Sequence, residues 1–119
     1  MSLEYQLDDF TISTDREKLN IDFIHDYLCN QSYWAQGRSI EIVKKTVENS
    51  LCFGVYEGKQ QIGFARVVTD YATFAWLCDV FIADDAKGQG LGKWLIERVV
   101  SHPDLQNLKN FLLATRDAH

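Results

Sequence analysis

A glycine-rich segment, KGQGLGK at residues 87–93, has the residue types and spacing best suited to ligand chemistry. Its three glycines alternate along the chain, which removes side chains from one face of the turn and lets the backbone approach a ligand closely. An apolar stretch precedes the segment and an amphipathic one follows it, so the segment is predicted to join a buried strand to a helix. The first N–H groups of a helix are unpaired and lie at the positive end of its dipole. The segment therefore predicts an anion site suited to a phosphate or diphosphate, with Lys87 and Lys93 adding positive charge.

Two nucleotide-binding motifs do not fit this segment. A Walker A loop needs G-x-x-x-x-G-K-[ST], but Gly88 and Gly92 are one residue too close and Trp94 stands where a hydroxyl is required. The dinucleotide motif G-x-G-x-x-G also differs from G-x-G-x-G, and too little chain follows it for the second half of such a fold. A glycine-rich turn that binds no ligand remains the structural alternative.

Hydrophobic periodicity predicts the elements that position this loop. Leu19, Phe23 and Tyr27 recur at helical spacing behind a capping box formed by Thr14 and Glu17. The expected strands cover 10–14, 51–57, 61–69, 73–82 and 110–115, and the expected helices cover 15–28, 40–49 (capped by Ser39) and about 91–101. The order β-α-α-β-β-β-α-β predicts an α+β fold: a mixed, mostly antiparallel sheet with helices packed on it.

Length and composition limit the function classes. The 119 residues fit a single domain, residues 1–119, and 46% hydrophobic content excludes a disordered chain. A net charge of −5 argues against nucleic-acid binding, because phosphate contacts need clustered positive charge. Three widely spaced cysteines predict neither a disulfide framework nor a metal site. No signal peptide and no 18-residue apolar stretch is evident, so we expect a cytoplasmic protein without membrane attachment.

The segment and the order of elements together resemble the GNAT superfamily of acyl-CoA-dependent N-acetyltransferases. That family's signature, R/Q-x-x-G-x-G/A between a strand and a helix, matches residues 87–92, with Lys87 in place of Arg or Gln. The lysine keeps the charge but loses bidentate donors. The resemblance covers nearly the whole chain and implies a three-layer fold, with helices on both faces of the sheet and a β-α-β unit that binds CoA.

The resemblance also implies site roles. Backbone amides of the loop would hold the diphosphate of acetyl-CoA, the acyl donor, while the end of the preceding strand would pair with its pantetheine arm and polarise the thioester. The residues concerned are Val80, Phe81, Ile82, Lys87, Gly88, Gln89, Gly90, Leu91, Gly92 and Lys93. The acceptor would be a primary amine of a small molecule or peptide, and Tyr33, Trp34 and Arg38 lie where the family places acceptor contacts.

Acetyl transfer needs a group that takes the proton of the attacking amine. Asp79 is the acidic residue within the strand at 73–82, and Asp117, after the last strand, is a weaker candidate. Strand alternation points residue 79 away from residue 80 unless a bulge intervenes. The alternative for Asp79 is a structural role in which its carboxylate is hydrogen-bonded.

Two further expectations concern residues outside the proposed site. His102 is expected to cap a helix C-terminus. Trp76 and Trp94 are expected in the core.

Members of the family usually continue into a further helix that carries a tyrosine used as a general acid, whereas this sequence ends at His119. We therefore expect a truncated chain, a sheet completed by another subunit such as a homodimer partner, or a dispensable acid. The alternative function is a non-catalytic acyl-CoA-binding or regulatory module. A purely structural interaction domain, which would bind no CoA, is a third possibility.

Overall fold

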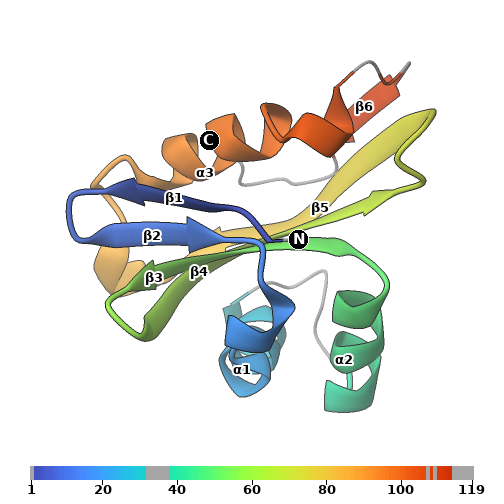
Figure 1. The fold of residues 1–119 in the computed structure, drawn as a ribbon. Helices are drawn as coiled ribbons and strands as arrows, with labels where there is room; N and C mark the ends of the chain where they lie inside the picture. The colour runs from blue at the N-terminus through green and yellow to red at the C-terminus, as the bar shows by residue number, and fades with distance from the viewer. Residues whose placement is uncertain (1, 32–37, 107, 109, 114–119) are drawn as a thin grey trace.

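A single sheet organises the chain. The computed structural model describes residues 2–31, 38–106, 108 and 110–113. Within these residues the sheet has six strands in chain order (Figure 1). The strands are β1 (Glu4–Leu7), β2 (Phe10–Ser13), β3 (Leu51–Glu57), β4 (Gln60–Thr69), β5 (Phe74–Ile82) and β6 (Asn110–Leu113). Neighbouring strands from β1 to β5 run antiparallel, and β6 runs parallel to β5. The predicted mixed, mostly antiparallel sheet is confirmed.

Helices cover both faces of the sheet. Helices α1 (Ile21–Gln31) and α2 (Ile40–Glu48) lie on one face, and α3 (Leu91–Val100) lies on the other (Figure 1). Short 3-10 turns occur at η1 (Arg16–Lys18), η3 (Asp84–Ala86) and η4 (Pro103–Leu105). One core packs α3 against the sheet, with Leu77 and Leu95 fully buried. A second core joins Ile24 of α1 and Val43 of α2 to Phe64 of β4. This three-layer arrangement agrees with the expected fold.

The N-terminal part departs from the sequence prediction in two ways. Strand β1 was not predicted, because its residues are mostly exposed and carry no apolar repeat. The helix expected over 15–28 is split into η1 and α1, and the expected capping box is wrong. The hydroxyl of Thr14 instead accepts a hydrogen bond from the Leu3 N–H (2.8 Å), because β1 pairs beside it. The carboxylate of Asp15 caps η1 by accepting from the Glu17 N–H (3.0 Å).

Other local predictions hold. Ser39 caps α2, with its hydroxyl accepting from the Ile42 N–H (3.2 Å), and β3 spans the residues expected. The prediction for Trp76 was wrong, because its side chain is 44% exposed. Its neighbours Ala75 and Leu77 belong to the core under α3, so Trp76 faces the opposite side of β5. Only the second half of β5, Asp79–Ile82, is buried throughout.

His102 differs from the expected charged cap at the end of α3. Its ring is buried against the Phe53 ring, and Nδ1 accepts a hydrogen bond from the Asp104 N–H (3.0 Å). An accepting Nδ1 requires an unprotonated nitrogen. Burial lowers the pKa of His102 from its usual value of 6.5. The residue therefore caps the following turn, η4, as a neutral ring.

This geometry predicts a pH-dependent stability. The unfolded state binds more protons than the native state at pH values between the lowered pKa of His102 and 6.5, so the free energy of unfolding should fall as the pH drops through that range. His102→Asn keeps a side-chain cap and removes the titrating group. Urea unfolding at about pH 7.5 and about pH 5.5 should give a smaller pH dependence for this variant. Equal pH dependence in both proteins would contradict the assignment.

Candidate functional site

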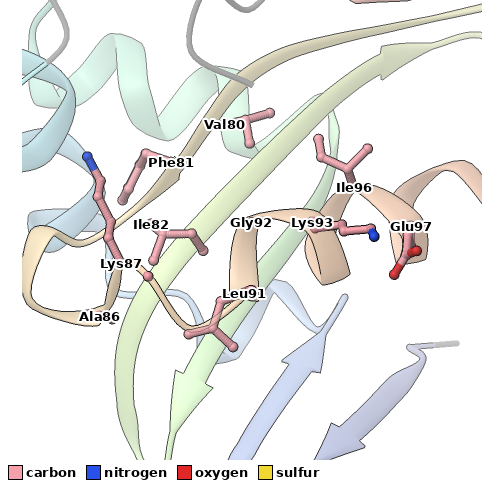
Figure 2. A pocket seen from close by; sticks show the side chains of 12 residues that line it. Val80, Phe81, Ile82, Ala86, Lys87, Leu91, Gly92, Lys93, Ile96 and Glu97 are labelled. Carbon is pink, nitrogen blue, oxygen red and sulfur yellow. The ribbon is translucent and has the colours of Figure 1, made fainter. Parts of the chain in front are cut away.

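A cavity of about 800 Å³ lies where β5 ends and α3 begins (Figure 2). Every residue that the sequence assigned to cofactor binding lines it, except Gln89. The Gln89 side chain instead donates to the Ala86 carbonyl (3.2 Å). Ala86, Ile96 and Glu97 also line the cavity and were not predicted. The fold thus gathers one strand end, one loop and one helix face around a single space, while the binding roles themselves remain predictions.

The glycines of the loop have distinct reasons for being glycine. Gly88 (φ +86°) and Gly90 (φ +77°) adopt left-handed backbone conformations that other residues rarely take. A Cβ atom at either position would meet nothing within 4 Å, so backbone conformation, and not crowding, requires glycine there. Gly90 precedes α3, whose first turn carries no acidic side chain. Unpaired helix N–H groups beside open space make a suitable anion site.

Lys87 and Lys93 differ in what their side chains contact. The Lys87 ammonium pairs with the Asp84 carboxylate (Nζ–Oδ1 3.1 Å). In Figure 2, the Lys87 side chain points toward Phe81 and away from Lys93. Both lysines line the cavity, but the Lys87 ammonium is directed at Asp84 in this structure, whereas Lys93 lies in the first turn of α3.

Tyr27 of α1 contacts the strand end and the turn beside the cavity, and the sequence analysis did not predict this. Its hydroxyl lies 3.1 Å from the Ile82 carbonyl and 3.2 Å from Asp84 Oδ1, so a donated hydrogen bond can reach either oxygen. Burial raises the pKa of the Tyr27 phenol. Its ring stacks on Phe81, with centroids 4.1 Å apart and planes 9° from parallel. The hydrogen bond and the ring stacking of Tyr27 thus connect helix α1 to the strand end that lines the cavity.

Asp79 lies beside the cavity in a bulge of β5. The register between β4 and β5 shifts so that Ala65 faces Val80 while Val67 faces Leu77. Asp79 Oδ2 accepts hydrogen bonds from Arg66 Nε (2.7 Å) and from Arg38 Nη1 (3.0 Å). Because Arg38 directly precedes the cap of α2, the carboxylate faces α1 and α2, whereas Val80 belongs to the core under α3. The bulge considered in the sequence analysis is present, and Asp79 still points away from Val80.

The three members of this ion-pair cluster are largely buried. The side chain of Asp79 is 3% exposed, that of Arg66 13% and that of Arg38 19%. Arg66 also donates to the Ser50 hydroxyl (3.2 Å). The sequence analysis named Asp79 and Arg38 for separate roles, whereas the fold brings them into contact. The other acceptor candidates, Tyr33 and Trp34, and the second base candidate, Asp117, lie outside the described residues.

The two halves of β5 differ in the neighbouring strands that they pair with among the described residues. Phe74–Leu77 pairs with Asn110–Leu113 of β6, the last residues that the structure describes at this end. Val80–Ile82 pairs with Ala65–Gly63 of β4 on the other edge and lines the cavity. The predicted pairing of Val80–Ile82 with the pantetheine arm stays a prediction.

The described residues contain no group of three or more histidine, cysteine, aspartate or glutamate side chains placed to hold a metal ion. In the same part of the chain, no helix is long and apolar enough to cross a membrane.

Comparison with known proteins gives consistent matches. The sequence model described as acetyltransferase (GNAT) family matches residues 21–119. A Gibberella zeae protein named "Putative acetyltransferase FG08082" is 28% identical over 92% of this chain and 73% of its own length. A GNAT-family crystal structure from Xanthomonas campestris is 44% identical, with a TM-score of 0.88 over 92% of this chain and 78% of that one. Spermidine N-acetyltransferase from Vibrio cholerae, solved with CoA and spermine, is 19% identical and shares the fold, with a TM-score of 0.61 over 79% of this chain and 63% of that one.

Proposed function

The chain belongs to the GNAT acetyltransferase family, and from this premise we propose that it transfers the acetyl group of acetyl-CoA to a primary amine by direct attack. The observation that carries the proposal is the cavity in which the loop Lys87–Lys93, the start of α3 and the strand end Val80–Ile82 converge. The acceptor would be a small molecule or a peptide. A homodimer and a cytoplasmic location remain predictions from the sequence.

The parts of acetyl-CoA would lie along the cavity in order. The diphosphate would lie at the N–H groups that begin α3, beside Gly90 and Lys93, where the helix dipole favours negative charge. The pantetheine arm would pair with the backbone of Val80–Ile82 along the edge that lines the cavity. A backbone N–H at this strand end would then donate to the thioester oxygen and stabilise the negative charge that develops there.

The reaction requires an amine nitrogen with a lone pair. Its attack on the thioester carbon forms a C–N bond, the C–S bond breaks, and CoA leaves as a thiolate that takes a proton. Asp79 is the base that the sequence predicts, with a structural ion-pair role as the alternative. Two guanidiniums already hold its Oδ2, so it would have to accept the proton through a lone pair that they do not occupy.

The acceptor would approach from the side of α1 and α2, where Arg38 lies. Tyr33 and Trp34 stay predicted acceptor contacts from the sequence. The Vibrio cholerae neighbour acts on spermidine, and the net charge of −5 here would likewise attract an ammonium group. This attraction supports an amine substrate without choosing among amines.

The test is thermal unfolding with and without acetyl-CoA, followed by CoA release in the presence of an amine panel. A ligand at about one hundred times its Kd adds about 2.7 kcal/mol, which raises the Tm of a domain of this size by roughly 10 °C. We expect this rise together with amine-dependent CoA release. A rise without turnover would favour the non-catalytic acyl-CoA-binding module, and no rise would contradict the proposed site.

A further inference from the structure

The cluster of Arg38, Asp79 and Arg66 has more positive than negative charge. Two guanidiniums converge on one carboxylate oxygen. Among the described residues, neither arginine pairs with any other carboxylate. Guanidiniums that are less than one-fifth exposed have lost much of their hydration, and a counter-ion offsets this cost. A second anion placed here would therefore be stabilised.

The cluster lies next to the strand end at which the reaction is proposed to occur. Asp79 directly precedes Val80, the first residue of β5 that lines the cavity, and one strand residue spans about 3.3 Å. Under the proposed function the thioester lies near Val80 and the acceptor approaches from the side of α1 and α2. Asp79 and its two guanidiniums face that same side, so they would lie within reach of a small acceptor. Trp76, on the same face of β5, exposes 44% of its surface and offers an aromatic wall to such a molecule.

We infer that this cluster selects acceptors that carry a carboxylate close to the amine, as amino acids do. The inference rests on the proposed function. Arg38 uses Nη1 for Asp79, and a guanidinium has several further N–H donors that can hold a second carboxylate. The acceptor carboxylate only anchors the molecule, while its amine forms the new C–N bond as described above.

The net charge of the protein and the local charge of the cluster both favour such a zwitterion over a polyamine. The net charge of −5 attracts the ammonium group from a distance, whereas the local surplus on Arg38 and Arg66 attracts the carboxylate on arrival. A polyamine has no acid group and would place positive charge beside these guanidiniums.

Matched substrates isolate the carboxylate. β-Alanine and ethylamine, lysine and cadaverine, and phenylalanine and phenethylamine differ only by the acid group within each pair. We expect kcat/KM, corrected for the neutral-amine fraction, to be about tenfold or more higher for at least one amino acid than for its matched amine. Arg38→Gln should collapse this ratio, and Arg38→Lys, which keeps the charge but loses the planar fork, should retain part of it.

Lys44→Gln is the matched control, because it removes the same charge from an exposed position on α2 and should leave the ratio unchanged. Circular dichroism on each variant checks that it folds. Titration calorimetry of the same pairs against the CoA-loaded protein gives a readout that needs no turnover, and amino acids should bind more tightly than their amines. Equal ratios and equal affinities would overturn the inference while amine acetylation stands. Failure to bind acetyl-CoA would count against the proposed function, and the calorimetric comparison with free protein would still decide the carboxylate preference.

Discussion

The Gly90→Asp variant is expected to bind acetyl-CoA about 100-fold or more weakly than the wild type. Gly90 lies at the N-terminus of α3 with φ +77°, and a side chain there would project into open space that we assign to the diphosphate. A carboxylate about 4 Å from one phosphate charge costs about 4 kcal/mol at an effective dielectric constant near 20. Isothermal titration with acetyl-CoA measures the loss.

Gly58→Asp is the matched control for backbone strain. Gly58 is also left-handed (φ +62°) with nothing within 4 Å of a Cβ atom, but it lies in the turn between β3 and β4 and does not line the cavity. Each substitution costs about 1 kcal/mol of backbone strain, so both should lower the Tm similarly. Only Gly90→Asp should lose the ligand. Gly90→Ala adds strain without charge and should weaken binding less.

Equal acetyl-CoA affinity in Gly90→Asp and Gly58→Asp would place the diphosphate elsewhere. Loss of affinity in both would indicate that strain and not charge governs binding. Each of these outcomes would contradict the assignment of the anion site to the start of α3.

Most residues that line the cavity could be named from the sequence because they lie close together in the chain. Left-handed glycines, a helix start and a preceding apolar strand are contiguous in residues 80–93, so their spacing alone indicates how they are arranged. The same holds for Ser39, whose cap joins residues three positions apart. Strand β1 was missed because a short, exposed strand is defined mainly by its pairing with β2.

Contacts between distant residues were not predictable from local patterns. Tyr27 meets Asp84 across 57 residues, and Arg38 meets Asp79 across 41. Both contacts depend on how α1 and α2 lie over the sheet, which hydrophobic periodicity does not specify. The bulge in β5 decides the surroundings of Asp79, and a bulge leaves no clear mark on an apolar strand. Trp76 was misplaced for a related reason, since apolarity does not reveal that one face of β5 is uncovered there.

Asp79→Asn is expected to destabilise the protein by about 3 kcal/mol, because it leaves two largely buried guanidiniums without their carboxylate. This corresponds to a fall in Tm of roughly 10 °C or more for a domain of this size. Asp22→Asn makes the same chemical change on an exposed side chain at the start of α1 and should cost only a few tenths of a kcal/mol. Thermal unfolding of both variants provides the comparison.

A second substitution separates the ion-pair role of Asp79 from that of a base. The loss of stability in Asp79→Asn is expected to come from uncompensated charge. In that case Arg66→Gln should destabilise the Asp79→Asn variant less than it destabilises the wild type, because it removes one of the unpaired guanidiniums. If Asp79 acts as a base instead, Asp79→Asn should leave the Tm unchanged, greatly lower kcat, and remove the acidic limb of the pH–rate profile. The geometry favours the first result, because a carboxylate oxygen held by Arg38 and Arg66 is placed to organise the bulge beside Val80. Proton removal from the amine would then fall to water or to a residue outside the described part of the chain.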